Sequence, residues 1–213
     1  MKTSKRKEKQ RLLIALIPQK EIVDNLNKIR KMAGVKKKKK SAPHITIVDN
    51  SFSSIKKVDE ELKKIAKLPR PFNAHVKGID TFIVKKTTGI ERYKHKNSLM
   101  YRIKNSSQLN NLRREILKRL DYLKTPASLN QWKKENPSLS EKALKNIKKY
   151  GTPFGLKEWK FHTTIGLIPK KKQKEILNKI RPLDIRRTMI INSLGLFIRK
   201  NGWKLYKKYK FKN

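Results

Sequence analysis

The chain repeats one order of segments. A short apolar segment containing His-x-Thr, then Pro or Ser, then a segment with helical spacing of apolar residues occurs near residue 44 and again near residue 162. β-branched residues surround both motifs, as is typical of buried or half-buried strands. A Pro-led helix also follows a strand in both halves. The repeat therefore predicts two similar lobes, each built from strands and helices.

The remaining pattern fills in these lobes. Apolar runs and alternation predict strands at residues 12–17, 44–48, 99–103, 160–168, 184–191, 194–199 and 203–209, and two strands around Gly78 within residues 72–85. Apolar residues at helical spacing predict helices between Pro18 and Gly34, after a cap at Ser51, Ser53 or Ser54, over 109–120, over 140–150 and after Pro169. Asn201-Gly202 predicts a hairpin between the last two strands.

The length of 213 residues suits one domain. Residues 1–10 are expected to form a basic tail, and residues 11–213 a single bilobal domain. Residues 86–97 are predicted to be an exposed loop. The segment at about 121–157 is rich in Pro and Gly and less regular, so we interpret it as an insertion or a lid.

The chain is strongly basic, because 57 Lys and Arg against 16 Asp and Glu give a net charge of +41. This charge excludes an acidic scaffold and attracts polyanions such as RNA, DNA or anionic lipid. Most of the basic residues, 44 of the 57, are Lys. Such a bias also arises from an AT-rich genome or a high-salt cytoplasm, and both explanations stay open.

The sequence gives no sign of an extracellular or membrane protein. It contains no Cys, which excludes disulfides and thiol nucleophiles. No apolar run approaches the roughly 18 residues that span a bilayer, and no signal-peptide core follows the basic start. We expect a cytoplasmic protein that does not associate with membranes.

The two motifs carry the candidate chemistry, in His44-Ile45-Thr46 and His162-Thr163-Thr164. Residues i and i+2 of a strand point to the same side, so each motif presents an imidazole and a hydroxyl together. Two such strands side by side would surround one cavity with two imidazoles and two hydroxyls, which suits hydrolysis of a phosphodiester. One neutral imidazole takes a proton from water, the other gives a proton to the leaving oxygen, and the hydroxyls bind phosphate oxygens.

The two motifs have two other interpretations, a polar strand face and a metal site. Strand histidines beside threonine also occur as a half-buried polar face, although two copies in matching contexts make this less favoured. A metal site is disfavoured, because the two histidines lack a third ligand at suitable spacing.

At these residues the chain resembles the 2H phosphoesterase superfamily. The frames are Ala42-Pro43-His44-Ile45-Thr46-Ile47-Val48 and Lys160-Phe161-His162-Thr163-Thr164-Ile165-Gly166-Leu167, and the resemblance covers most of residues 11–210. It implies an α+β fold, bilobal and pseudo-twofold, in which two antiparallel sheets flank a central cleft and helices lie outside. The superfamily includes proteins described as 2′-5′ RNA ligases and RNA cyclic phosphodiesterases.

The resemblance also implies an activity and roles for the residues. The activity is metal-independent and cofactor-free hydrolysis of RNA 2′,3′-cyclic phosphate ends to 2′-phosphate, or 2′-5′ ligation in the reverse direction. His44 would be the proton donor, His162 the proton acceptor, and Thr46 and Thr164 would hold the phosphate. The partner would be RNA or another phosphoester substrate, bound by a monomer.

The chain departs from compact members of this superfamily in one region. The two motif histidines are 162 − 44 = 118 residues apart, and the excess falls within 121–157. The sequence Tyr150-Gly151-Thr152-Pro153-Phe154 is similar to a Gly-x-Pro-aromatic element in a subgroup of the superfamily.

Several residues are weaker candidates. The basic run before the first motif contacts RNA phosphates or is a solvated loop, and it consists of Lys36, Lys37, Lys38, Lys39 and Lys40. Four aromatic residues either stack on a base or, more commonly beside strands, belong to the core: Tyr101, Phe154, Trp159 and Trp203. His75 is interpreted as a strand-face residue and His95 as a surface residue.

Two rival functions remain at the level of sequence. One is a basic RNA-binding protein with weak or no catalysis, in which the charge supplies the affinity. The other is a phosphoesterase for a small cyclic-phosphate metabolite, with the segment at 121–157 closing over the cleft.

Overall fold

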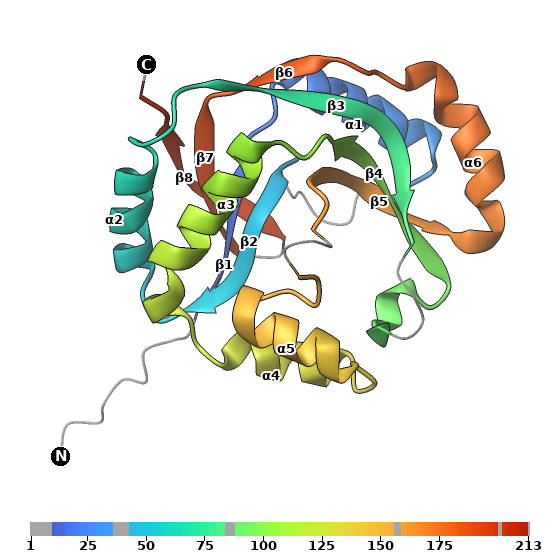
Figure 1. The fold of residues 1–213 in the computed structure, drawn as a ribbon. Helices are drawn as coiled ribbons and strands as arrows, with labels where there is room; N and C mark the ends of the chain where they lie inside the picture. The colour runs from blue at the N-terminus through green and yellow to red at the C-terminus, as the bar shows by residue number, and fades with distance from the viewer. Residues whose placement is uncertain (1–9, 36–42, 84–87, 156–158, 200–201, 213) are drawn as a thin grey trace.

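The structure is a computed structural model that describes residues 10–35, 43–83, 88–155, 159–199 and 202–212 (Figure 1). Strands and helices alternate through the first part of the chain, and three consecutive strands come last. In chain order the elements are β1 (Gln10–Leu16), α1 (Lys20–Met32), β2 (Ile45–Phe52), α2 (Ile55–Ile65), β3 (Phe72–Phe82), η2 (Glu91–Tyr93), β4 (Lys96–Ile103), α3 (Ser107–Arg119), η3 (Asp121–Leu123), α4 (Ala127–Glu135), α5 (Glu141–Tyr150), β5 (His162–Pro169), η4 (Lys170–Lys172), α6 (Gln173–Ile180), η5 (Arg181–Leu183), β6 (Thr188–Ile191), β7 (Ser193–Arg199) and β8 (Trp203–Lys210).

The strands form one curled antiparallel sheet in the order β6-β3-β4-β5-β2-β1-β7-β8 (Figure 1). The order divides into two halves of four strands, β6-β3-β4-β5 and β2-β1-β7-β8, which meet at β5 and β2. Each half holds one of the two His-x-Thr motifs on its inner strand. The predicted α+β fold is thereby confirmed, and the two expected sheets are the halves of this curled sheet.

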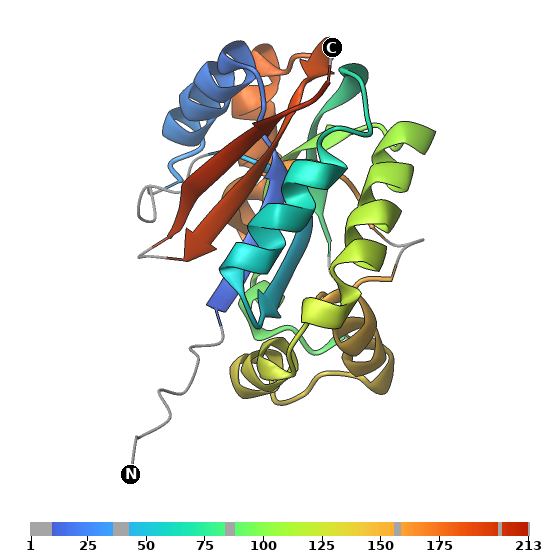
Figure 2. The same cartoon turned by 90° about the vertical axis from the view of Figure 1, so that its left-hand side faces the viewer.

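The sheet separates two apolar regions, one on each of its faces. Leu12, Ile14 and Leu16 of β1 lie in the main core, together with buried residues of α1, α2, α3 and α6. The alternate residues Leu13 and Ala15 face the opposite side of the sheet and form a small cluster with Phe197. Figure 2 shows α2 and α3 lying side by side along the sheet. Because strand side chains alternate between faces, one face is covered by helices and the other is left to form the site.

Local sequence signals explain where the helices begin. The hydroxyl of Ser54 accepts a hydrogen bond from the Lys57 amide and caps α2, so it is the capping residue among the three serines considered. Ser140 caps α5 in the same way, and Gly151 ends that helix at φ 75°. The apolar stripe of α1 is buried as the spacing predicts.

The prediction of two strands within residues 72–85 is wrong, because β3 is a single strand from Phe72 to Phe82. The register skips a residue between Val76 and Gly78, where the backbone takes φ 107°. The Asp184 carboxylate accepts the Ile79 amide at 2.8 Å beside this bulge. Glycine therefore marks a bulge within a continuous strand here, instead of a turn between two strands.

Three further expectations concern the chain's edges and loops. Gln10 belongs to β1, and residues 1–9, where the basic tail is expected, lie outside the described residues. The stretch predicted as an exposed loop contains η2, the start of β4 and a buried Ile90. The last two strands pair as predicted, with Arg199 opposite Trp203, while residues 200–201 of their connection are not among those described.

The segment at about 121–157 forms a pair of helices next to the sheet (Figure 1). Helix α5 was predicted, and α4 was not. The buried residues of α4 are Ser128 and Trp132, and of its other residues only Leu129 packs beside Trp132, so the helix has no apolar stripe that the sequence could reveal. Whether the segment is an insertion relative to other members stays a prediction.

Candidate active site

The two motifs meet at the seam between the halves of the sheet. Within the described residues β2 and β5 are paired at one position, Ile45 with Thr163, which are the second residues of the two motifs. Both of these side chains are buried, at 0% and 1% exposure. The first and third residues of each motif therefore face the opposite side of the sheet.

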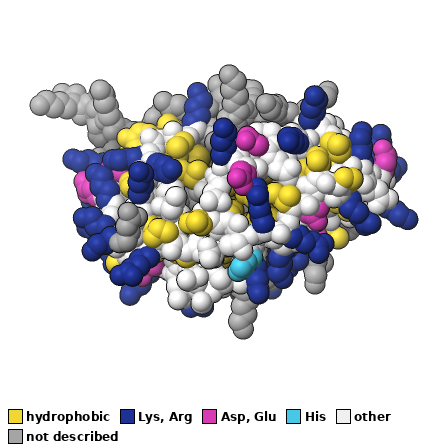
Figure 3. All heavy atoms as spheres, turned by 90° about the horizontal axis from the view of Figure 1, so that it is seen from above, with side chains coloured by type: hydrophobic (Ala, Val, Ile, Leu, Met, Phe, Trp, Pro, Cys, Tyr) yellow, Lys and Arg dark blue, Asp and Glu magenta, His cyan; other side chains and the backbone are white. Residues whose placement is uncertain are grey.

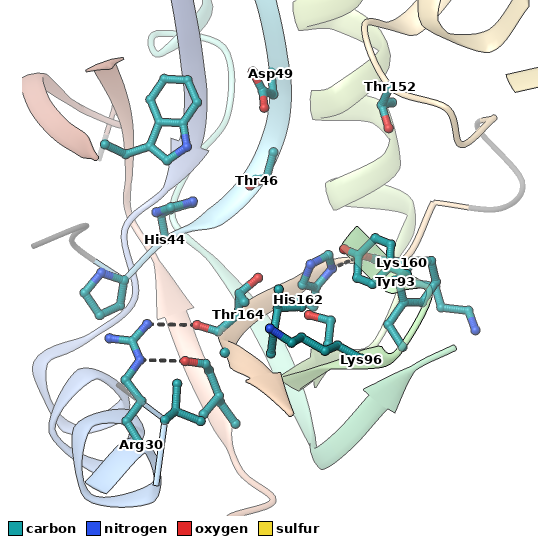
Figure 4. A pocket seen from close by; sticks show the side chains of 18 of the residues that line it. Arg30, His44, Thr46, Asp49, Tyr93, Lys96, Thr152, Lys160, His162 and Thr164 are labelled. Carbon is teal, nitrogen blue, oxygen red and sulfur yellow. Dashed lines mark hydrogen bonds between the residues drawn. The ribbon is translucent and has the colours of Figure 1, made fainter. Parts of the chain in front are cut away.

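That side contains a cavity of about 1040 Å³, and His44, Thr46, His162 and Thr164 all line it. Figure 4 shows the two imidazoles on opposite sides of the two threonines. A cavity of this volume is larger than one phosphate group and is in the range of small-molecule sites. The structure thus brings the four side chains selected from the sequence to a single cavity, from strands 118 residues apart.

The ring of His162 is held by the backbone of its own strand. Its Nδ1 lies 2.7 Å from the carbonyl oxygen of Lys160 (Figure 4). A carbonyl only accepts, so Nδ1 carries the proton, and in the neutral ring Nε2 is the nitrogen with an available lone pair. The ring also stacks on Phe82, with centroids 6.4 Å apart and an angle of 19°. This arrangement suits a proton acceptor.

The ring of His44 packs against an apolar surface. Its centroid lies 5.5 Å from that of Phe197, at an angle of 47°. Phe197 is buried with Leu13 and Ala15, and Trp203 packs against the same cluster. His44 and His162 therefore approach the cavity from different surroundings, one from each half of the sheet.

An ion pair that the sequence did not suggest presents its carboxylate to the cavity. Asp49 of β2 lines the cavity, and both of its carboxylate oxygens accept from Arg11, at 2.8 Å each. Burial lowers the pKa of Arg11, but the charge and hydrogen bonds of Asp49 outweigh burial, so the pKa is raised. The paired arginine offsets a negative charge that would otherwise repel an anionic ligand.

An aromatic group forms the wall beside His162. The ring centroid of Phe82 lies 5.1 Å from that of Phe154 and 6.4 Å from that of Tyr93, and both pairs are edge to face. All three rings line the cavity. The Nζ of Lys160 lies 5.8 Å from the Phe82 ring. Neither Phe82 nor Tyr93 was a candidate in the sequence, because a single aromatic at the end of a strand carries no distinguishing signal.

The four aromatic candidates divide between core and cavity. Tyr101 belongs to the core, where its hydroxyl donates to the Leu183 carbonyl at 3.0 Å and burial raises its pKa to about 12. Phe154, Trp159 and Trp203 line the cavity, although Trp159 is only 8% exposed. The core interpretation thus holds for Tyr101 and for Trp159, which belongs to the main core, while Phe154 and Trp203 remain candidates for contact with a ligand.

The helix pair α4–α5 closes one side of the cavity. Trp132, Gly151, Thr152 and Phe154 from this segment are among the lining residues. A Cβ on Gly151 would lie 2.6 Å from the Asp49 carbonyl oxygen, so the end of α5 touches the strand of the first motif. The Gly-x-Pro-aromatic element noted in the sequence is therefore part of the cavity wall.

Other sequence candidates lie elsewhere. The run from Lys36 to Lys40 is outside the described residues, so its contact with RNA stays a prediction. His75 accepts or donates a 2.8 Å hydrogen bond with Thr188 on the exposed face of β3, and His95 is exposed. Among the described residues, no group of three or more His, Cys, Asp or Glu is placed to hold a metal ion.

Basic side chains are abundant on the surface of the protein (Figure 3). Figure 3 shows Lys and Arg side chains spread over the visible face, with few Asp and Glu between them. In the part of the chain that the structure describes, no helix has the length and apolar character needed to cross a bilayer.

Comparisons with known proteins agree with this geometry. The family described as "Protein of unknown function (DUF1045)" matches residues 55–204, and the family described as "LigT like Phosphoesterase" matches residues 17–89. The chain belongs to the first of these families, and its residues 17–89 are similar to LigT-like phosphoesterases. A search of curated proteins found no significant match in sequence.

Solved structures show the same fold at low sequence identity. The protein TT0787 of Thermus thermophilus has a TM-score of 0.56 and 12% identity, over 94% of this chain and 97% of that one. E. coli LigT complexed with 3′-AMP has a TM-score of 0.52 and 10% identity, over 97% and 99%. A structure described as a phosphoesterase has a TM-score of 0.51 and 12% identity, over 97% and 100%. At these identities the likeness concerns the fold.

Proposed function

We propose that this protein is a 2H phosphoesterase. Its proposed activity is metal-independent hydrolysis of RNA 2′,3′-cyclic phosphate ends to 2′-phosphate. His44 is the proton donor, His162 the proton acceptor, and Thr46 and Thr164 bind the phosphate oxygens. The observation that carries the proposal is that both motifs line one cavity. The proposed enzyme is a cytoplasmic monomer that needs no cofactor, and 2′-5′ ligation is the related reaction in which a 5′ hydroxyl replaces water as the nucleophile and the same 3′ oxygen leaves.

In the proposed reaction, Nε2 of neutral His162 removes a proton from a water molecule. The water oxygen forms a bond to phosphorus while the bond from phosphorus to the 3′ oxygen breaks. Protonated His44 gives its proton to that 3′ oxygen, and the 2′-phosphate is left. The threonine hydroxyls donate to the non-bridging oxygens, where negative charge develops. The proton bound to His162 and the proton lost by His44 are exchanged with solvent before the next turnover.

The tautomer of His162 supports the division of roles. With Nδ1 donating to the Lys160 carbonyl, the neutral ring presents Nε2 as an acceptor. A ring fixed in this tautomer loses little freedom when it accepts a proton from water. His44 packs against Phe197, which leaves its role as donor to rest on the family resemblance.

The test is hydrolysis of an oligoribonucleotide that ends in a 2′,3′-cyclic phosphate. His44→Ala and His162→Ala should each lower kcat by at least about 10²-fold, the contribution expected of a general acid or base. His75→Ala and His95→Ala are matched controls on the surface and should keep full activity. EDTA should have no effect. Full turnover in both motif variants would refute the proposal, and RNA binding that survives them with a steep salt dependence would favour the RNA-binding alternative.

A second candidate is a phosphoesterase for a small cyclic-phosphate metabolite. The observation that favours it is the contribution of the α4–α5 segment to the cavity wall, which narrows the space for a long chain. A panel of cyclic mononucleotides, oligonucleotides and sugar cyclic phosphates separates the two candidates. A kcat/KM that is higher for oligonucleotides than for every small ester favours RNA, and the opposite order favours the metabolite.

A further inference from the structure

Each His-x-Thr-x motif ends in a β-bulge. In β2, Thr46 pairs with Ala15 and Val48 with Ile14, so Ile47 is an extra residue. In β5, Thr164 pairs with Met100 and Gly166 with Leu99, so Ile165 is an extra residue. Both extra residues occupy the fourth position of their motif, directly after the threonine. A bulge turns the strand locally and so helps to aim the side chains beside it.

An arginine from the other half of the sheet binds each bulge. Arg113 of α3 donates from Nε to the Ile47 carbonyl at 3.1 Å. Arg30 of α1 donates from Nε to the Ile165 carbonyl and from Nη2 to the Thr164 carbonyl, both at 2.9 Å (Figure 4). Helix α1 precedes β2 in the chain but binds β5, whereas α3 precedes β5 but binds β2. The two contacts therefore cross the seam in opposite directions.

In the described part of the chain, the sheet itself supplies no ladder hydrogen bond between the two motif strands at these carbonyls. Because β2 and β5 pair at one position within the described residues, the strands diverge beyond it and lack further ladder hydrogen bonds to each other. A backbone carbonyl left without a donor in such a place destabilises the fold. The guanidinium groups supply the missing donors and tie each motif strand to the opposite half.

Arg113 donates to a backbone carbonyl although its charged group is buried. Its side chain is 2% exposed, stacks on Trp159 at 4.2 Å, and its Nη1 and Nη2 have no hydrogen-bond partner. Among the described residues, neither Arg30 nor Arg113 forms an ion pair. Burying an unpaired charge opposes folding. An arrangement that destabilises the fold behind a motif indicates that its benefit is to the geometry of the site.

We propose that Arg30 and Arg113 are positioning residues for the proposed phosphoester chemistry. Arg30 holds the backbone behind Thr164, and Arg113 holds the backbone behind Thr46, so that both hydroxyls meet the same phosphate. This inference rests on the proposed function. A displacement of about 1 Å in such a group lowers turnover by roughly 10²-fold, so even a small shift of either motif strand would slow the reaction.

The test is a set of four double-mutant cycles on kcat and KM, each of the two arginines with each of the two threonines. Arg30→Met and Arg113→Met should each lower kcat by roughly 10- to 100-fold, with KM changed by less than about threefold. Coupling should be specific: Arg30→Met should have little further effect in Thr164→Val but most of its effect in Thr46→Val, and the reverse should hold for Arg113→Met. Equal coupling to both threonines, or an unchanged kcat, would overturn the proposal.

Neighbouring cations serve as controls for charge and for folding. Lys31→Met on α1 and Arg114→Met on α3 remove one exposed positive charge from the same helices and should leave kcat unchanged. Arg30→Lys offers one donor direction in place of the planar pair and should recover part of the lost kcat. If Arg113→Met does not fold, Arg113→Lys and the Arg30 series decide the question by the same criterion.

A binding measurement separates this inference from the proposed function. Inorganic phosphate is titrated into the wild type and the same variants by calorimetry. If no phosphodiester is hydrolysed by the wild type, the proposed function fails, and the dissociation constant of phosphate still reports the coupling. Weaker phosphate binding with the threonine-specific pattern supports the positioning role, and unchanged binding in both arginine variants contradicts it.

Discussion

Replacing Arg113 by Met should leave the stability of the fold almost unchanged while activity falls. Burial lowers the pKa of this arginine from 12.5 to about 10, against a smaller opposing effect of Tyr150. At about 1.4 kcal/mol for each tenfold change, folding disfavours the charged guanidinium by about 3 kcal/mol. Methionine fills the space of the aliphatic stem of arginine and carries no charge, so this penalty disappears in the variant.

Two favourable contacts disappear with it. The hydrogen bond from the charged Nε to the Ile47 carbonyl contributes about 1.5–3 kcal/mol. Stacking of the guanidinium on Trp159 contributes about 1–2 kcal/mol. The losses, about 2.5–5 kcal/mol together, are of the same order as the gain of about 3 kcal/mol, so the midpoint of thermal unfolding should fall by no more than about 8 °C. Arg113→Ala lacks any group to fill the space and should cost a further ~2 kcal/mol or more, on the order of a buried large-to-small change.

Calorimetric unfolding of the wild type and both variants at pH 7 tests this balance, with kcat measured on the same samples. The expected result is a Met variant with wild-type stability and reduced kcat, and an Ala variant that is reduced in both. If Met destabilised the protein as much as Ala, Arg113 would be a structural stabiliser, and the reasoning from its buried charge would be refuted.

Three other perturbations follow from the structure. Asp49→Asn removes a negative charge from the cavity and leaves the charge of Arg11 without its counter-ion. The KM for an anionic phosphoester should therefore fall severalfold in steady-state assays. A raised KM would contradict this expectation. Gly151→Ala places a Cβ at φ 75° and against the Asp49 carbonyl, so denaturant unfolding should show a loss of at least about 1–2 kcal/mol, and wild-type stability would argue against the close approach. Burial raises the pKa of Asp59, but hydrogen bonds from Tyr209 and two lysines outweigh burial and hold it below its usual range. The resulting stability is present above about pH 4 and is lost as pH falls through the lower folded-state pKa, so melts from pH 2 to 7 should show a weaker acid dependence in Asp59→Asn.

Much of the site could be predicted because its signal is local. Each motif places an imidazole and a hydroxyl two residues apart on a strand, and that spacing determines a common face before any tertiary contact is known. The repeated order of segments then indicates two lobes. What the sequence could not provide is the seam: that Ile45 pairs with Thr163 depends on how the two halves join.

The sequence positions of Arg30 and Arg113 carry a signal. Arg30 and Arg113 each follow a buried leucine of the helical stripe by four residues, Leu26 and Leu109, and so occupy stripe positions themselves. A charged residue on an apolar stripe is informative in most proteins. With 57 basic residues in this chain, the signal was lost in the surrounding charge.

Other features depended on contacts that no spacing encodes. The bulge at Gly78 was mistaken for a turn, because glycine at positive φ occurs in both. Helix α4 buries Trp132 and a serine rather than an apolar stripe, so periodicity does not reveal it. The pairing of Asp49 with Arg11 joins neighbouring strands 38 residues apart in the chain.

The central claim is that both motif imidazoles act on one anion. Ring-nitrogen NMR of the protein during a titration with inorganic phosphate tests it directly, since the chain has four histidines and two of them serve as internal controls. The account predicts that the signals of His44 and His162 shift together with one dissociation constant, while those of His75 and His95 stay in place. Shifts of only one motif histidine, or of the two with different dissociation constants, would contradict it.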